Sequence, residues 1–237
     1  MKSTPSGIVY GEVGKLCIQA KINKLVIGYW LRILLSKNVT TFVHLFYSMS
    51  YKLYISGDYK SLWLHNVKVI LDQCGLSYIW ENQNTIDSYK VKCIINSRID
   101  DIETQKWYTS ISVSPMCNMY HVFKRQYGFE NYLLLPDSRS RILITKLRCR
   151  NLKLPVKTSV YLPISNVCTL CNENKIGDEN HYLFVCPAFN NCRSIYIKKY
   201  FYNRPTLEKA RQFMCISTPK HLNNLGKFLN ILERQFK

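Results

Sequence analysis

The sequence predicts a mainly α-helical protein, in which a long helical part is followed by a small α+β module and a helical tail. Apolar residues recur at steps of three and four along most of the chain, which is the period of an amphipathic helix. Hydrophobic residues make up 47% and aromatic residues 13% of the 237 positions, enough to bury a core. Composition places the three parts at residues 1–136, 137–200 and 201–237.

The N-terminal part contains several separate apolar stripes with helical spacing. By residue number, the stripes predict helices at 15–35, 43–53, 62–74, 100–111 and 120–127. Gly75 follows the third stripe, where a glycine favours the left-handed backbone that ends a helix. Asp100 opens the fourth stripe, and we expect its side chain to cap the N-terminus of that helix.

The tryptophans all lie within these stripes, at Trp30, Trp63, Trp80 and Trp107. An exposed tryptophan can stack on a nucleic-acid base. An aromatic ring on the apolar face of an amphipathic helix is more often part of the core, because burial removes a large apolar surface from water. We therefore expect all four to be core residues.

The chain is strongly basic, with 33 lysines and arginines, 15 acids and a net charge of +18. Such an excess repels itself in a compact fold, so it indicates a polyanionic partner. Nucleic acid, either RNA or single-stranded DNA, fits this charge better than a membrane does. The apolar stretch at residues 25–35 is interrupted by Gly28 and Arg32 and falls short of the roughly 20 residues that a membrane span requires.

The N-terminus carries no apolar run that resembles a signal peptide, which predicts an intracellular protein, either nuclear or cytoplasmic. The ten cysteines are then reduced thiols or metal ligands and not a disulfide framework. Six of them are scattered in apolar surroundings, and we expect most to be core residues: Cys17, Cys74, Cys93, Cys117, Cys149 and Cys215.

Residues 168–187 hold a motif with the spacing C-x2-C-x9-H-x4-C, formed by Cys168, Cys171, His181 and Cys186. Two residues between thiolates let one tight turn direct both sulfurs at a single ion, and a short helix can supply the second pair. Asp178 is placed to cap that helix, and Pro187 to end it. The motif predicts one structural Zn²⁺ that nucleates the α+β module, because protein side chains fill all four ligand positions.

Two alternatives to this ligand assignment remain. The four side chains can be ordinary core cysteines and a surface histidine, although a complete set in so short a segment argues against that reading. Cys192 lies shortly after Cys186 and is the expected substitute ligand if one assignment fails.

Residues 137–163 contain seven basic residues and only one acid, Asp137. Leucines and isoleucines are interleaved with the basic residues, which are Arg139, Arg141, Lys146, Arg148, Arg150, Lys153 and Lys157. Residues 141–150 predict a helix with one apolar and one basic face, and residues 154–156 indicate extended backbone. Most charge runs are solvated helix faces, but the sign imbalance and the neighbouring metal motif favour a surface that contacts phosphates.

The sequence offers no set of residues that would form an active site. Asp100 and Asp101 form the one acid pair worth testing as a polymerase metal site, but they lack a third carboxylate and flanking apolar strands. The chain has no H-E-x-x-H helix, no deaminase signature, no nucleophile elbow and no glycine-rich phosphate loop. We therefore expect neither catalysis nor a small-molecule substrate.

The metal motif and several segments before it resemble one family. The segment after Cys171 reads Gly-Asp-Glu-x-His-Tyr-Leu-Phe-x-Cys-Pro over residues 177–187, and Arg193 follows it. Together with residues 9–12, 63–64, 75–80, 123–124, 129–133, 147–148 and 154–156, it is similar to the C-terminal region of LINE-type (non-long-terminal-repeat) retrotransposon reverse transcriptases. The likeness covers roughly residues 9–193, and the CCHC zinc finger is its most specific part.

The resemblance implies a role in nucleic-acid binding within an RNA-directed DNA polymerase. In that family the polymerase palm and the endonuclease lie upstream of this region, so only the four metal ligands carry over to this chain. We expect a fragment, or a remnant of a gene, without polymerase activity of its own. The rival interpretations are a zinc-stapled structural or protein-interaction module and an inert retroelement remnant.

Overall fold

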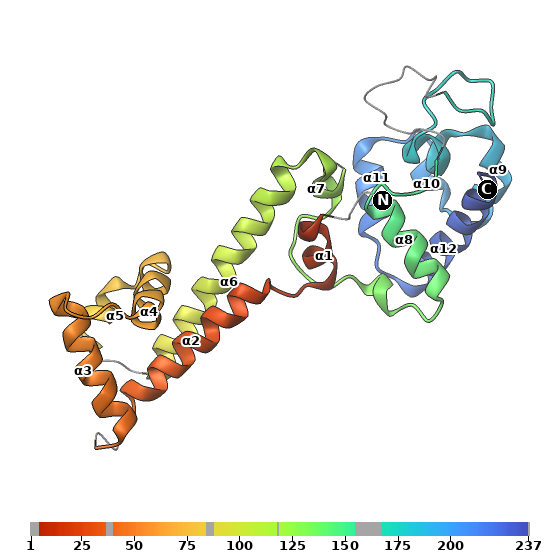
Figure 1. Ribbon diagram of the computed structural model, residues 1–237. Coiled ribbons are helices and arrows are strands. Elements are labelled where there is room, and N and C mark those ends of the chain that lie inside the picture. The colour runs from red at the N-terminus through yellow and green to blue at the C-terminus, as the bar shows by residue number, and fades with distance from the viewer. Residues whose placement is uncertain (1–4, 37–39, 84–87, 118, 155–166, 237) are drawn as a thin grey trace. The chain divides into compact units, whose positions relative to one another are not determined.

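The computed structural model describes residues 5–36, 40–83, 88–117, 119–154 and 167–236, and most of them are helical (Figure 1). The prediction of a mainly α protein is confirmed. The α+β module is not, because residues 137–154 and 167–200 contain helices and turns but no strand. Their one pairing of extended backbone is an isolated antiparallel bridge between Val167 and Ile176. Residues 155 and 156, expected to be extended, lie outside the described ranges.

The chain forms two compact units. The central unit comprises residues 16–107, and the C-terminal unit comprises residues 1–15 and 108–237. This division departs from the boundaries expected at residues 136 and 200. The physical reason is packing, since one core crosses both positions and includes Tyr132, Leu143, Phe184 and Leu229.

The central unit is built from α2 (Ile18–Leu34), α3 (Phe42–Ser56), α4 (Leu62–Gln73), α5 (Ser77–Glu81) and most of α6 (Ser88–Val113). Thr41 and Ser61 cap α3 and α4, because their side chains accept hydrogen bonds from backbone amides of the first turn. Gly75 adopts a φ of +69° just after α4, which confirms its predicted role at that helix end. None of the described helices combines the length and the apolar character needed to cross a membrane.

The tryptophans lie largely where the apolar stripes predicted them. Trp30, Trp80 and Trp107 are buried, and Trp30 stacks on Trp80 with ring centroids 6.2 Å apart. The indole of Trp30 donates a hydrogen bond of 2.9 Å to the hydroxyl of Tyr47. Trp63 is half-buried, with its ring edge-on to Tyr47 at 6.1 Å. Three of the four are thus core residues, and the fourth lies at the edge of the core.

The expected N-cap at Asp100 is wrong. Asp100 lies in the middle of α6, and its carboxylate accepts a hydrogen bond of 2.6 Å from the ammonium of Lys24. The helix begins at Ser88, because Ile95 and Ile99 extend the apolar stripe upstream into the core.

The C-terminal unit contains the metal motif and a larger set of short helices. Before the motif these are α1 (Ser6–Val13), η2 (Pro115–Cys117), α7 (Tyr120–Phe123), η3 (Asn131–Leu134) and α8 (Ser138–Arg148). Within and after the motif they are η4 (His181–Val185), η5 (Pro187–Phe189), α9 (Asn190–Tyr196), α10 (Lys199–Tyr202), α11 (Leu207–Cys215) and α12 (Pro219–Arg234). Asp137 caps α8, since its carboxylate accepts hydrogen bonds from the amides of Arg139 and Ser140.

A buried network of charged groups joins α1 to α8. Arg148 at the end of α8 is 4% exposed and donates to both carboxylate oxygens of Glu12, at 2.7 and 3.0 Å. Its guanidinium also donates to the carbonyl of Met214 at 3.1 Å and lies 3.2 Å from the carboxylate of Glu130. Lys124 completes the network with a 2.5 Å contact to Glu130. Every charge in the network therefore has a partner, as burial requires.

Helices α8 and α12 pack closely where Gly226 meets Ser140. A Cβ atom on Gly226 would lie 2.1 Å from the hydroxyl oxygen of Ser140 and 2.5 Å from its Cβ. Ser140 is buried, and its hydroxyl donates to the carboxylate of Asp137 at 2.5 Å, so it has little room to move. The two helices can reach this distance because position 226 has no side chain.

We predict that Gly226→Ala lowers the free energy of unfolding by about 1–3 kcal/mol, because the added methyl group forces α8 and α12 apart. Denaturant unfolding followed by circular dichroism measures the change. Gly28→Ala is the matched control, since nothing lies within 4 Å of a Cβ at that position of α2. The control should leave stability unchanged or raise it by up to about 1 kcal/mol. Equal effects of the two substitutions would contradict the close packing of α8 on α12.

Candidate metal centre

The structure brings the four predicted ligands together. The sulfurs of Cys168, Cys171 and Cys186 and a ring nitrogen of His181 all lie within 4.8 Å of one another. The two sulfurs of Cys168 and Cys186 are 3.8 Å apart, and the sulfur of Cys171 lies 3.5 Å from Nε2 of His181. All but Cys171 are buried. The group can hold one metal ion.

A tight turn presents the first pair of ligands. The amide of Cys168 donates to the carbonyl of Lys175 at 2.8 Å, beside the bridge between Val167 and Ile176, and this closes the loop that carries Cys171. Within the loop, the amide of Leu170 donates to the sulfur of Cys168 at 3.4 Å. An amide hydrogen bond of this kind stabilises a thiolate, as the C-x2-C spacing predicts.

The second pair of ligands comes from η4, which is a π-helix. The amide of Cys186 donates to the carbonyl of His181 at 2.7 Å, a bond that spans five residues. In an α-helix, with 3.6 residues per turn, positions 181 and 186 would lie on different faces. The wider π turn places one almost above the other and lets both side chains reach the same ion. Asp178 caps this segment as predicted, because its carboxylate accepts a 2.8 Å hydrogen bond from the amide of His181.

Arg193 supports this segment in a way that the sequence did not reveal. Its side chain is 2% exposed and donates to the carbonyls of Leu183 at 2.8 Å and Cys186 at 2.9 Å, and to the side-chain oxygen of Asn190 at 2.7 Å. These carbonyls end the ligand helix and would otherwise be buried without a partner. The sequence shows a basic residue shortly after the last ligand, but it does not show whether that arginine is buried against the ligand segment or solvated.

Gly177 leaves the space that lets Tyr182 pack beside the ligands. A Cβ atom at position 177 would lie 2.5 Å from the hydroxyl of Tyr182 and 3.3 Å from Cα of Cys168. Tyr182 is fully buried and sits in the same core as the ligand cysteines. The glycine in the motif is therefore explained by close packing next to the metal ligands.

The pKa values of the ligands reflect the buried site. Burial raises the pKa of the Cys186 thiol to about 12, so a metal must displace its proton on binding. Burial also favours the neutral imidazole of His181 and lowers its pKa, and the neutral ring is the form that binds a metal. At Cys168, burial opposes ionisation, but the amide of Leu170 and neighbouring side chains outweigh it and lower the pKa.

Cys192 was the expected substitute ligand, but it lies outside the cluster of candidate metal ligands found among the described residues. It is half-buried and packs against the core of the C-terminal unit. Burial raises the pKa of its thiol, which is the behaviour of a core cysteine.

The basic segment is placed differently from the prediction. Arg139 and Lys146 both pair with Glu233 of α12, with a distance of 2.9 Å for Lys146. Arg141 donates to the carbonyl of Leu135. Arg148 is buried against Glu12, so its prediction as a phosphate contact is wrong: the guanidinium has no solvent-facing surface to offer.

The remaining three residues predicted to contact phosphates are Arg150, Lys153 and Lys157. Arg150 is half-exposed and lies 3.8 Å from the carboxylate of Glu179. Lys153 is exposed. Lys157 lies outside the described residues. The basic side chains of α8 therefore contact carboxylates and carbonyls of the same chain.

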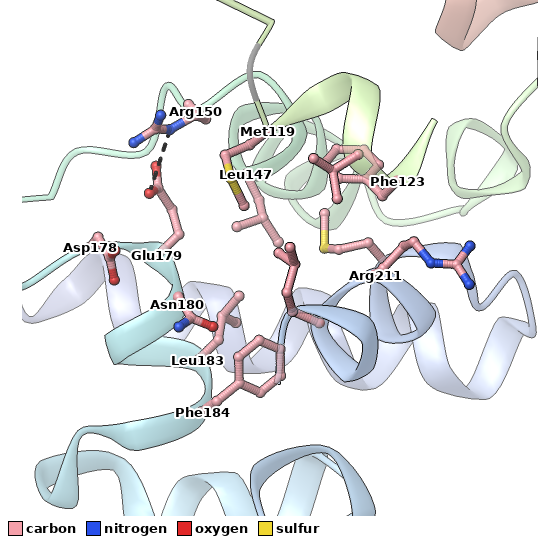
Figure 2. Close-up of a pocket in the computed structure, with 14 residues that line it drawn as sticks. Met119, Phe123, Leu147, Arg150, Asp178, Glu179, Asn180, Leu183, Phe184 and Arg211 are labelled. Atoms are coloured by element: carbon pink, nitrogen blue, oxygen red, sulfur yellow. Dashed lines mark ion pairs between the residues drawn. The ribbon is translucent and has the colours of Figure 1, made fainter. Parts of the chain in front are cut away.

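A pocket of about 100 Å³ adjoins the ligand segment (Figure 2). Its walls are mainly apolar and include Met119, Phe123, Leu147, Leu183 and Phe184. Two arginines that line the pocket form ion pairs, Arg150 with Glu179 and Arg211 with Glu208 of the same helix, α11. Asp178 and Glu179 line the pocket from the residues just before η4, so the metal segment forms part of its wall.

Comparison of the chain with protein-family models, with curated proteins and with solved structures finds no match.

We predict that Cys171→Ser abolishes stoichiometric metal binding, because it removes one of four ligands from the site. Cys192→Ser is the matched control, since its sulfur lies outside the ligand cluster, and it should retain one metal ion per chain. Elemental analysis of the purified variants measures the metal, and circular dichroism checks that each is folded. A full equivalent of metal in Cys171→Ser would overturn the assignment.

Proposed function

We propose that this chain is a zinc-stabilised, nucleic-acid-binding module, corresponding to the C-terminal region of a LINE-type retrotransposon reverse transcriptase and carrying no catalytic residues of its own. The spacing of the four ligand atoms is the observation on which the proposal depends. A tetrahedral zinc ion separates two thiolate sulfurs by about 3.8 Å, and a sulfur from an imidazole nitrogen by about 3.5 Å, given its usual bond lengths. Two separations in the chain have these values, 3.8 Å between the sulfurs of Cys168 and Cys186 and 3.5 Å between the sulfur of Cys171 and Nε2 of His181, and all four ligand atoms lie within 4.8 Å of one another.

The ligand types support zinc over other metals and a structural role over a catalytic one. Three thiolates and an imidazole in a tetrahedral arrangement suit zinc, whereas magnesium and calcium prefer oxygen ligands. Zinc would take all four bonds from the protein and would have no open position for an activated water. The binding free energy would then contribute to the folding of the segment around residues 168–186.

The charge of the chain supports nucleic acid as the partner. A net charge of +18 gives a sequence-independent attraction to phosphates, which does not require a specific base contact. The acid pair Asp100 and Asp101 occupies successive positions inside α6, and successive helical residues point about 100° apart. Two carboxylates that diverge in this way do not converge on a metal pair, which supports a binding role and not polymerase chemistry.

A protein-interaction role is the second candidate, favoured by an apolar surface on α3. Its large side chains are more than half exposed at Phe42, Leu45, Phe46 and Met49. A contiguous apolar face on a soluble domain commonly marks a contact with another protein. If that contact is a second copy of this chain, sedimentation velocity at rising concentration should detect a dimer that Phe46→Asp abolishes. A monomer at all concentrations would exclude that form of the role.

We predict that the zinc-loaded protein binds single-stranded RNA or DNA of mixed sequence, with log affinity falling linearly as log salt rises. Each phosphate that the protein neutralises should contribute about 0.7 to the slope, because a condensed counterion is released. Fluorescence anisotropy at several salt concentrations measures the slope. Chelation of the zinc should weaken binding, since the ligand segment would lose its fold. Absence of binding at low salt would refute the nucleic-acid function.

A further inference from the structure

A basic and aromatic surface follows the metal segment, around α10. We name it the α10 surface and define it by exposed side chains close together in the sequence and by Lys209, which contacts one of them: Lys198, Lys199, Tyr200, Arg204 and Lys209. Among the described residues no carboxylate pairs with its four cations, whereas Arg139, Lys146 and Arg148 of α8 each pair with a carboxylate. Tyr200 is 55% exposed, so its ring is accessible to a partner. Glu208, the acid next to Lys209 in the sequence, is paired with Arg211.

Two residues of this surface, Tyr200 and Lys209, are held in place by contacts with their neighbours. The ammonium of Lys209 lies 4.9 Å from the ring centroid of Tyr200, a cation–π contact. The same ammonium donates to the carbonyl of Asn203 at 2.6 Å, which ties α11 to the loop after α10. The hydroxyl of Tyr200 donates to the side chain of Gln212 at 3.0 Å. The ring of Tyr200 and the ammonium of Lys209 are therefore arranged before any partner binds.

The core anchors this surface next to the metal segment. Phe201 of α10 is buried and meets the ring of Phe213 at 5.2 Å, edge to face. Tyr202, at the end of α10, lies under the guanidinium of Arg193 at 5.8 Å, and Arg193 holds the carbonyls of the ligand helix. Order in the metal segment is thus connected to order in α10 through residues that touch both.

We infer that the α10 surface is where this chain binds single-stranded nucleic acid, its cations contacting phosphates and Tyr200 stacking on an unpaired base. This inference rests on the proposed function and specifies its location. Unpaired strands are recognised by basic grooves that carry aromatic platforms, because every base has a flat face that a ring can cover. A duplex keeps its bases stacked on one another and offers no free face to Tyr200.

The test compares two variants that remove the same number of charges. Lys198→Gln/Lys199→Gln/Arg204→Gln alters the α10 surface, and Lys220→Gln/Lys227→Gln/Arg234→Gln alters exposed positions of α12. Binding to a mixed-sequence single-stranded oligonucleotide is measured by anisotropy at several salt concentrations. We expect the first variant to lower the log–log slope by about two units, as the loss of three phosphate contacts requires. We also expect affinity to fall at least tenfold more in the first variant than in the second.

Substitutions of Tyr200 test the stacking step separately. Tyr200→Leu should weaken single-strand binding by about tenfold or more at fixed salt and leave the slope unchanged. Tyr200→Phe should keep most of the affinity, because the ring is retained. Zinc content and circular dichroism establish that every variant is folded.

The outcomes separate this inference from the function that it specifies. Wild-type binding with equal losses in the two triple variants would overturn the α10 surface and leave the nucleic-acid function standing. A duplex bound as tightly as the single strand, with no effect of Tyr200→Leu, would overturn the single-strand assignment. No binding by the wild type would overturn the proposed function and the inference together.

Discussion

The ion pair between Arg148 and Glu12 is the constraint on which the C-terminal unit depends, because it joins residues 136 positions apart in a buried setting. The carboxylate of Glu12 receives two hydrogen bonds from one guanidinium, and the pair raises the pKa of Arg148, although burial acts against the charge. Removal of either partner would leave an uncompensated buried charge, which typically costs about 3–5 kcal/mol. The N-terminal helix α1 is thereby part of the same unit as the metal segment.

A second buried arginine plays a similar part at the metal centre. Arg193 has no carboxylate partner among the groups it contacts, and backbone carbonyls and the side chain of Asn190 take its hydrogen bonds instead. The carbonyl of Leu183 belongs to the π-helix that begins at the ligand His181, and that of Cys186 follows directly after its last residue. Metal ligation from one side and Arg193 from the other would hold this unusual turn in place, because a π-helix has little intrinsic stability.

The distribution of cations over the unit has a functional consequence. Three basic residues of α8 pair with acids of other helices, Arg148 with Glu12 and both Arg139 and Lys146 with Glu233, and so stabilise the packing of α8 within the unit. The cations around α10 have no such carboxylate partners in the described part of the chain and surround an exposed tyrosine. A net charge of +18 therefore does not indicate by itself which cations are available to a partner. Internal pairing decides availability, and under the proposed function it favours α10 over α8 as the surface for nucleic acid.

The sequence by itself determined the helical class, several helix ends and the four candidate metal ligands. These features depend on neighbours in the chain: Gly75 ends α4, Asp178 caps the ligand segment, and the C-x2-C spacing brings two sulfurs together. The tertiary structure alone decided that Arg148 is buried, that His181 and Cys186 meet through a π turn, and that Asp100 lies inside a helix. The physical reason is that burial and ion pairing depend on partners far away in the chain, such as Glu12 for Arg148, which no local spacing reveals.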